Sequence, residues 1–282
     1  MPHITGSTDV YAQQTSWKTV MKNTAVDTVE KNWQAFTGQS EGFSSDGDTY
    51  ADAEELAWML EDLPVSPDAK ALDIATGTGE FARALSPMVG AVVGLDATEA
   101  MLEQGKKFVE KAGIKNINFK KGVVQDMPFG DASFDIVSCR YAFHHFADPK
   151  PVISEMVRVC KPGGHVIIVD IIIPDESTAV ENNYYEWLCD QSHTRALHPG
   201  EFETCFRLFG MEVISARTRV LENKFVEWMD FSLTEKQHRE EILRAVHAEL
   251  KGGPKTGLGV YVQDSVLCFN QLGLSIVGRT PA

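Results

Sequence analysis

The chain has 282 residues, of which 43% are hydrophobic and 23% charged, so its composition is typical of a folded globular protein and excludes a collagen-like or wholly disordered chain. Its 26 Lys and Arg stand against 40 Asp and Glu, and the net charge of −14 argues against a nucleic-acid partner because such a field repels phosphate backbones. No apolar run approaches the roughly 18 residues that a membrane span needs, and the N-terminus lacks the pattern of a secretory signal.

The first 45 residues are polar but carry spaced aromatic side chains. Their pattern predicts an amphipathic helix over residues 19–36. We expect residues 1–45 to form a helical cap or lid, and residues 46–282 to form the main domain. Within that domain the first helix is expected over about 51–63, ending before Pro64.

Short apolar strands then alternate with helical patterns. Strands are expected in the segments KALDIA, GAVVGLD, NINFKKGVV, FDIVSCR and HVIIVDIII, with helices after the first, second and fourth of them. Such alternation is typical of βαβ units, whose right-handed crossovers place helices on both faces of a parallel sheet. The sequence therefore predicts an α/β fold with a doubly wound sheet.

After Pro174 the pattern becomes irregular, which indicates elements added to this sheet. Residues 174–205 and 221–262 are expected to be helical and to lie on the substrate side, with a strand between them in MEVISARTRV. The segment SVLCFNQLGLSIVGRT is typical of one long strand or of a pair of strands.

The segment DIATGTGEFA, from Asp73 to Ala82, lies where the first strand turns into the next helix. Gly77 and Gly79 permit tight backbone angles and the close approach of a ligand. The N-terminus of the following helix offers unpaired N–H groups and the positive end of its dipole. Because glycines at such a turn often serve turn geometry alone, the neighbouring carboxylates decide the interpretation.

Three carboxylates flank this loop and the ends of the next two strands. Asp96 ends the second strand, where a carboxylate can accept from both hydroxyls of a ribose, and Asp126 follows the third strand, where it can accept from an adenine amino group. Asp73 precedes the glycines, a position poorly suited to a pyrophosphate but suited to the ammonium of a methionine moiety. Together they favour S-adenosylmethionine over a nicotinamide dinucleotide.

These residues resemble the motifs of class I S-adenosylmethionine-dependent methyltransferases, most closely the ubiquinone/menaquinone-biosynthesis C-methyltransferase group. The match covers residues 45–175 and rests on Asp73-x-x-x-Gly77-x-Gly79, on Asp96 and on the segments TGTGE, QDMPF, FDIV, CRYAFHHFADP and RVCKPGG. The resemblance implies a Rossmann-like, seven-stranded sheet, mostly parallel with an antiparallel last strand. It also implies a site for S-adenosylmethionine, with S-adenosylhomocysteine as product, at Tyr50, Asp73, Ala75, Thr76, Gly77, Thr78, Gly79, Asp96, Ala97, Met101, Gln125, Asp126, Met127 and Arg140.

The methyl group of this cofactor is already activated by its sulfonium, so a base is needed only if the acceptor must lose a proton. Candidate catalytic residues are His144, His145 and His193, since histidine titrates near neutrality. Asp190 is expected on one helical face with His193, as the group that orients it. The residues expected to touch the acceptor are Tyr141, His144, Tyr185, His193 and Arg195; the alternative is that they belong to a solvated lid helix or to the floor of the cofactor pocket.

We therefore expect a methyltransferase that acts on a small-molecule acceptor, apolar or aromatic, by in-line displacement. Two other classes stay open: an NAD(P)-dependent oxidoreductase, which Asp73 and Asp126 disfavour, and a non-catalytic regulatory protein that binds S-adenosylmethionine. The five cysteines are scattered without a metal-ligand spacing, so neither a metal site nor a disulfide framework is expected. We expect a cytoplasmic monomer or homodimer.

Overall fold

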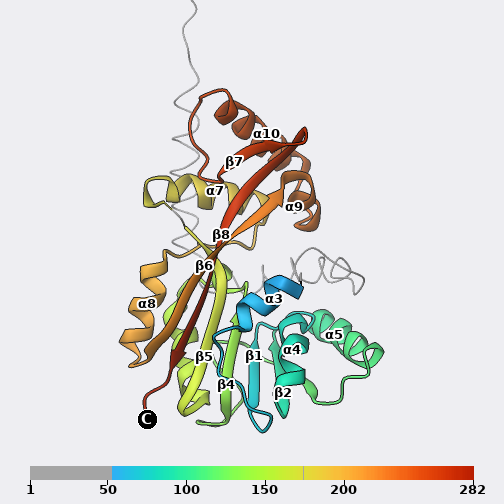
Figure 1. The fold of residues 1–282 in the computed structure, drawn as a ribbon. Helices are drawn as coiled ribbons and strands as arrows, with labels where there is room; N and C mark the ends of the chain where they lie inside the picture. The colour runs from blue at the N-terminus through green and yellow to red at the C-terminus, as the bar shows by residue number, and fades with distance from the viewer. Residues whose placement is uncertain (1–52, 174) are drawn as a thin grey trace, which may run out of the picture.

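The computed structural model describes residues 53–173 and 175–282 (Figure 1). The cap expected over residues 1–45 and the candidate cofactor residue Tyr50 lie outside the described residues. The described part contains one eight-stranded sheet, ordered β3-β2-β1-β4-β5-β8-β6, with β7 paired to β8. The strands are β1 (Lys70–Ile74), β2 (Ala91–Asp96), β3 (Ile117–Lys121), β4 (Phe134–Arg140), β5 (Cys160–Ile172), β6 (Glu212–Lys224), β7 (Val260–Gln263) and β8 (Val266–Arg279).

The strands β1 to β5 pair in parallel, whereas β8 is antiparallel to both β5 and β6. This order confirms the predicted Rossmann-like, doubly wound sheet with an antiparallel last strand. The helices are α3 (Ala53–Leu60), α4 (Glu80–Leu85), α5 (Glu99–Lys111), α6 (Pro149–Val159), α7 (Ala179–Cys189), α8 (Pro199–Leu208), α9 (Phe225–Phe231) and α10 (Lys236–Leu250), with short 3-10 helices η1 (Ser86–Met88), η2 (Phe143–His145) and η3 (Glu176–Thr178).

Alternate residues of β1 serve two different cores, because successive side chains of a strand point to opposite faces of the sheet. Leu72 and Ile74 pack into one core together with side chains of α6 and α8. Ala71 packs into the other core, with side chains of α3, α4 and α5. Helices therefore cover both faces of the sheet, and the apolar segment KALDI is buried almost throughout.

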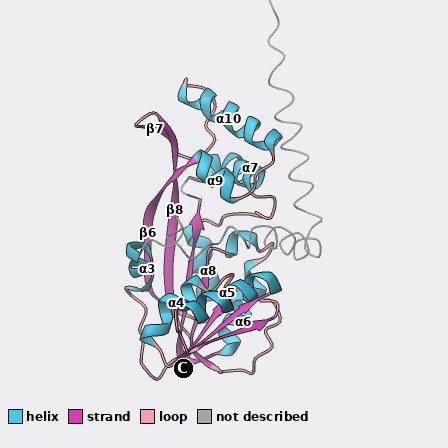
Figure 2. Cartoon of the chain, turned by 90° about the vertical axis from the view of Figure 1, so that its right-hand side faces the viewer, coloured by secondary structure: helices cyan, strands magenta, loops and turns pink. Residues whose placement is uncertain are grey.

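The strand β8 connects the sheet to a second group of elements, which we call the upper lobe: α7, α9, α10 and β7. Residues 272–279 of β8 pair with β5, whereas residues 266–269 pair with β7. The upper lobe stands beyond the carboxyl ends of the parallel strands, and its helices lie together at that end in both views (Figures 1 and 2). It has its own apolar core, which includes Phe225, Trp228 and Phe269.

Two expectations for the C-terminal half need correction. The range 221–262, expected to be helical, also contains the end of β6 and all but the last residue of β7. Burial alternates strictly along the whole of β6, as expected for a strand with one face packed and the other exposed. The strand β7, an eighth strand beyond the seven predicted, is joined to β8 by Asp264 and Ser265, whose φ values of 47° and 65° fit a two-residue hairpin turn.

The range 174–205, expected on the substrate side, is divided by the structure. Its helix α7 enters the upper lobe, whereas α8 packs against α6 and the sheet.

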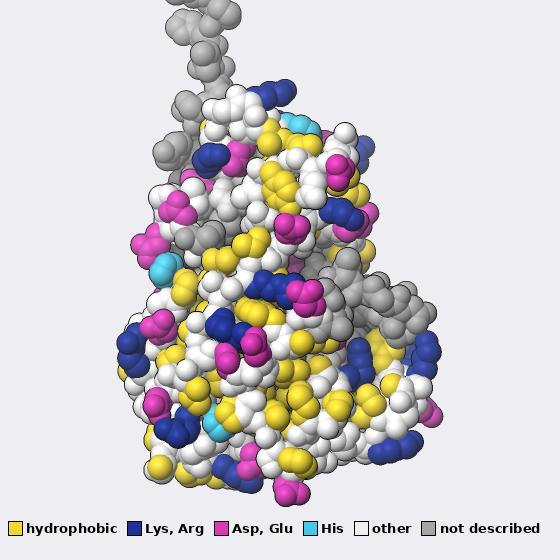
Figure 3. Space-filling view, viewed as in Figure 1, with side chains coloured by type: hydrophobic (Ala, Val, Ile, Leu, Met, Phe, Trp, Pro, Cys, Tyr) yellow, Lys and Arg dark blue, Asp and Glu magenta, His cyan; other side chains and the backbone are white. Residues whose placement is uncertain are grey.

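On the face seen in Figure 3, Lys and Arg side chains are interspersed with Asp and Glu rather than gathered into a basic patch. Within residues 53–173 and 175–282, no helix is both long and apolar enough to cross a bilayer.

Candidate functional site

A cavity of about 860 Å³ lies between the carboxyl ends of the parallel strands and the upper lobe. The loops after β1, β2 and β3 line its lower half. The loop after β4, α7, the end of β6, α9 and Gln271 of β8 line its upper half. The predicted cofactor residues that line it are Ala75, Thr76, Gly77, Thr78, Asp96, Ala97, Met101, Gln125 and Arg140, and the predicted catalytic and acceptor residues are Tyr141, His144, His145 and His193.

The remaining predicted residues of the described part do not line this cavity. Arg195 is exposed and forms two hydrogen bonds with Glu201 at the start of α8. Tyr185 packs against the core of the upper lobe. Asp126 is exposed beside the lining residue Gln125; the others outside the lining are Asp73, Gly79 and Met127.

The loop after β1 has left-handed backbone angles at three positions. Ala75, Gly77 and Gly79 have φ values of 48°, 54° and 77°. A Cβ on Gly77 would meet nothing within 4 Å, so the backbone there faces open space. A Cβ on Gly79 would lie 2.7 Å from the ring of Phe119, so this glycine lets β3 pack against the start of α4. Of the two glycines, Gly77 is therefore the one that leaves room for a ligand.

The carboxylate of Asp96 holds the glycine loop and the turn after β2 together. Its Oδ2 accepts from the backbone N–H of Gly77 and its Oδ1 accepts from that of Thr98, both at 2.8 Å. Burial raises the pKa of Asp96, while these backbone donors act in the opposite direction. A carboxylate offers about four acceptor sites, so Asp96 can support the loop and still accept from a ligand hydroxyl.

Asp73 lies behind the loop, and the structure does not bring it to the cavity as the sequence predicted. Its Oδ2 accepts from the hydroxyl of Thr76 at 2.5 Å and its Oδ1 accepts from that of Ser138 at 2.8 Å. Ser138 stands beside Asp73 because the two residues are partners in the β1–β4 register. Burial raises the pKa of Asp73 to about 6 despite both hydroxyl bonds. Its observed contacts are therefore structural, fixing the start of the loop to β4.

Arg140 and Tyr141, at the end of β4, are both tied to acidic side chains from helices. Arg140 forms an ion pair of 2.5 Å with Glu80, the first residue of α4. The hydroxyl of Tyr141 donates to Oε1 of Glu55 in α3 at 2.5 Å. Burial raises the pKa values of both Glu55 and Tyr141. These contacts hold α3 and α4 against the cavity wall.

The ring of His144 is fixed by a carboxylate inside β5. Its Nδ1 lies 2.5 Å from Oδ1 of Asp170, whose side chain is buried. Asp170 also accepts from the backbone N–H groups of Phe143 and Ile171. Burial alone would lower the pKa of His144, but the charge and the hydrogen bond of Asp170 outweigh it and raise that pKa. Because Nδ1 faces the carboxylate, Nε2 is the atom left to act as a proton acceptor.

The other two histidines are buried in their neutral form. His193 donates from Nε2 to Oδ1 of Asn183 at 2.8 Å, because that oxygen can only accept and also receives the N–H of Ala196. Burial, helped by the charge of His144, lowers the pKa of His193 well below its usual value. The same causes lower the pKa of His145 to about 4. The ring centres lie 4.0 Å apart for His144–His145 and 5.5 Å apart for His144–His193.

The predicted pairing of Asp190 with His193 on one helical face is wrong. The helix α7 ends at Cys189, so the two residues share no helix. Oδ1 of Asp190 instead accepts from the N–H and the hydroxyl of Ser192, at 2.8 and 2.6 Å. Among the described residues, no group of three or more His, Cys, Asp or Glu side chains is arranged to hold a metal ion.

A buried carboxyl completes the upper half of the cavity. Glu186 of α7 lines the cavity, and its Oε1 accepts from Nε2 of Gln271 at 2.7 Å. The oxygen of Gln271 in turn accepts from Nδ2 of Asn223 at 3.0 Å, which fixes the orientation of the amide. Burial raises the pKa of Glu186 to about 7. The sequence reasoning missed Asp170 as a site residue, although a charged residue inside the apolar run HVIIVDIII is a signal that the sequence does contain.

Comparisons with known proteins find methyltransferases that resemble this chain. Residues 72–168 match the family described as a methyltransferase domain. The chain is 36% identical over 162 residues to an uncharacterized methyltransferase, YcgJ, of Bacillus subtilis, and 39% identical over 124 residues to a demethylmenaquinone methyltransferase of Bacillus cereus. The two alignments cover 57% and 42% of this chain, but only 64% and 52% of those proteins, so the chain spans between half and two thirds of these curated relatives.

The solved structure of YcgJ from Bacillus subtilis matches with a TM-score of 0.73 at 27% identity, covering 82% of this chain and 100% of that one. Because the match covers this much of the chain, the similarity includes the upper lobe as well as the βαβ half. The predicted resemblance to methyltransferases is thereby confirmed.

Proposed function

We propose that the protein transfers a methyl group from S-adenosylmethionine to a small-molecule acceptor, since residues 72–168 match the methyltransferase-domain family. The observation that carries the proposal is the division of one cavity into two halves of different chemistry. The lower half combines a left-handed glycine loop with Asp96, and the upper half combines fixed imidazoles with Glu186.

The lower half fits a nucleoside cofactor. The open space at Gly77 allows a ligand to approach the backbone, and Asp96 is already oriented by two N–H groups, so that its remaining lone pairs can accept from ribose hydroxyls. Gln125 and Met101 line the same region. We assign the remaining lining positions of the predicted set, Ala75, Thr76, Thr78, Ala97 and Arg140, to this cofactor site as well.

The cofactor, when bound, supplies a methyl group already activated by a sulfonium, so the protein has mainly to position the acceptor and remove water. His144 is the group that accepts a proton in this proposal, through Nε2. Asp170 is its positioning residue, because it holds the ring and its tautomer. His145 and His193, kept neutral by burial, form the wall beside it.

The acceptor is proposed to have an apolar or aromatic body. Trp228 and Phe231 of α9 line the cavity together with the polar residues His144 and Glu186. Aromatic surfaces of this kind bind apolar groups by burial and by ring contacts. Tyr141, which lines the cavity at the end of β4, stands at the border between the two halves.

Isothermal titration calorimetry tests the proposal. We expect one S-adenosylhomocysteine or S-adenosylmethionine to bind per chain, and no binding of NAD at comparable concentration. Binding of NAD with no response to S-adenosylhomocysteine would replace the proposal with the oxidoreductase class.

A further inference from the structure

We infer that the methyl acceptor is a small primary or secondary amine, which enters as the ammonium and is held by Glu186 and Asp190 on one side and by Trp228 and Phe231 on the other. This inference deepens the proposed function and rests on it. Four observations on the upper half of the cavity lead to it: the hydrogen bonds already made by its polar groups, its carboxylates, its arginines and its aromatic wall.

Three polar side chains of the upper half, His144, His193 and Asn223, direct their hydrogen-bond donors to other groups of the protein. The Nδ1–H of His144 is directed at Asp170, and the Nε2–H of His193 at Asn183. Asn223 uses Nδ2 for the carbonyl of Leu221 and for Gln271. What these side chains leave toward the cavity is acceptors: Nε2 of His144 and Nδ1 of His193.

Two carboxylates of this half, Glu186 and Asp190, follow the same rule. Glu186 and Asp190 both line the cavity. Oε1 of Glu186 accepts from Gln271, and Oδ1 of Asp190 accepts from Ser192. The second oxygen of each carboxylate has no hydrogen bond to another described residue. Neither oxygen is among the buried polar atoms that lack a partner. A ligand that fits this wall must therefore bring donors, and an ammonium brings several on one atom.

The charge of the wall favours a cation over a neutral polyol. The two arginines that line the cavity are already paired with acidic side chains, Arg140 with Glu80 and Arg219 with Glu54 at 3.5 Å. Among the described residues, no arginine or lysine forms an ion pair with Glu186, and its hydrogen-bond partner is the neutral amide of Gln271. A carboxylate or phosphate ligand would meet like charge there, whereas an ammonium meets opposite charge in a partly desolvated site.

The aromatic wall suits the same ligand. Trp228 lines the cavity and is held by an edge contact with the ring of Phe225 and a tilted contact with that of Phe269, so that it is a rigid surface. Ring faces attract cations in addition to burying apolar area. A ligand with an ammonium head and an apolar body therefore matches both sides of the upper half.

The chemical step balances without any further reactant. The ammonium loses one proton to Nε2 of His144, which restores the lone pair on nitrogen. That lone pair forms the new N–CH₃ bond while the S–CH₃ bond breaks and its electron pair stays on sulfur, which becomes neutral. The products are the N-methylated ammonium and S-adenosylhomocysteine, and the proton on His144 is released to water.

Ligand-observed NMR titration of the full chain saturated with S-adenosylhomocysteine tests the inference with three probes of one shape: phenethylamine, 2-phenylethanol and 3-phenylpropionate. We expect phenethylamine to bind at least tenfold more tightly than the other two. The variant Glu186→Gln keeps an oxygen for Gln271 but turns an amide donor toward the cavity, so the preference should shrink to less than twofold.

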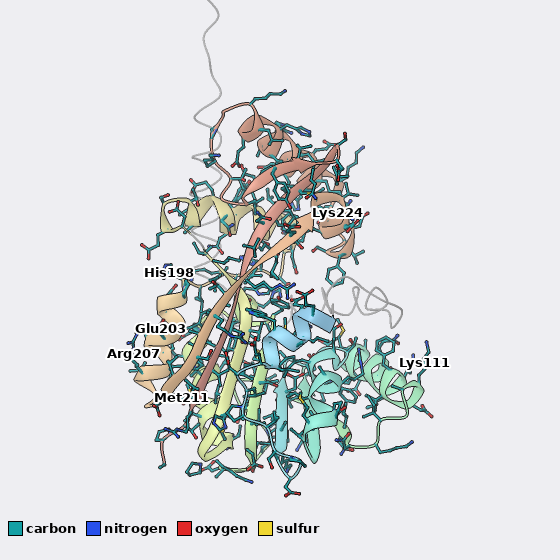
Figure 4. All side chains as sticks on the ribbon, in the orientation of Figure 1. Lys111, His198, Glu203, Arg207, Met211 and Lys224 are labelled. Carbon is teal, nitrogen blue, oxygen red and sulfur yellow. The ribbon has the colours of Figure 1, made fainter. Side chains whose placement is uncertain are left out.

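The matched control is Glu203→Gln, the same chemical change on the outer edge of α8, where Glu203 pairs with Arg207 far from the cavity (Figure 4). This variant should keep the full preference for the amine. Equal or tighter binding of the alcohol or the carboxylate by the native chain, or no binding of the amine at millimolar concentration, would overturn the inference. Failure of S-adenosylhomocysteine itself to bind would instead overturn the proposed function.

Discussion

Nδ1 of His144 lies 2.5 Å from Oδ1 of Asp170, so a ring on the loop after β4 is oriented by a carboxylate buried inside β5. The two residues are brought together by the parallel pairing of β4 with β5, in which Arg140 stands opposite Val169. The contact leaves Nε2 as the reactive atom and raises the pKa of the imidazole. Several consequences of the site can be measured.

Asp170→Asn should change the rate and its pH dependence together. A base must be neutral to act, so kcat should rise with pH through the pKa of His144, which Asp170 holds above its usual value. Without that carboxylate the pKa falls, and the rising limb of the kcat profile should move to lower pH. We also expect kcat to fall roughly 10- to 100-fold, part of what a general base supplies, because the ring loses its fixed tautomer. An unchanged profile would show that His144 is not the base.

Asp96→Asn should weaken cofactor binding. The amide can offer one oxygen, but its NH₂ group would face the N–H of Gly77 or of Thr98, which now donate to the carboxylate. Hydrogen bonds to a charged group contribute roughly 1.5–3 kcal/mol each, so the Kd for S-adenosylhomocysteine should rise tenfold or more. Calorimetry on the native and variant chains measures this; equal affinities would remove Asp96 from the cofactor site.

The two glycines of the loop should respond differently to alanine. In Gly79→Ala the new Cβ would meet the ring of Phe119 at 2.7 Å in a backbone with φ of 77°, so we expect a clear loss of thermal stability. In Gly77→Ala the Cβ meets nothing, so only the left-handed strain of roughly 1–2 kcal/mol remains. That variant should stay folded but bind S-adenosylhomocysteine less tightly. The reverse ranking in a thermal melt would contradict this division of roles.

Glu186→Gln should stabilise the chain at high pH. Burial raises the pKa of Glu186 from 4.5 to about 7 in the folded chain, so its contribution to stability is present below about pH 4.5 and is lost as pH rises through 7. The ionised side chain therefore costs stability at pH 8, and the uncharged glutamine removes that cost. The Tm of the variant should exceed that of the native chain at pH 8 and match it at pH 4.5. A Tm difference between Glu186→Gln and the native chain that does not change with pH would refute the account of Glu186.

The parallel half of the fold was predictable because its signals are local. Most of its strands contain a short apolar run, and Gly77, Gly79 and Asp96 lie in the loops or at the strand ends where a ligand crevice forms in such sheets. The upper half was not predictable in the same way. His144, Asp170, Glu186 and Gln271 come from four distant segments, and their contacts depend on strand register and on the length of β8.

Asp73 shows that the sequence can predict the position of a residue without predicting the direction of its side chain. The sequence places it correctly at the end of β1, but the direction of its side chain depends on what stands beside it in the sheet. Pairing in register with Ser138 gives its carboxylate a hydroxyl partner on β4, and the turn of the loop adds Thr76. Similarly, the spacing of Asp190 and His193 indicated a shared helical face, but α7 ends one residue before Asp190 and the chain turns there.

A crystal structure of the complex with S-adenosylhomocysteine tests the central claim most directly, namely that one cavity holds the cofactor below and the acceptor above. The account predicts the ribose hydroxyls at Asp96, the nucleoside against the loop at Gly77, and the sulfur facing the space between Tyr141 and His144. A ligand bound elsewhere, or one whose sulfur faces away from His144, would contradict it.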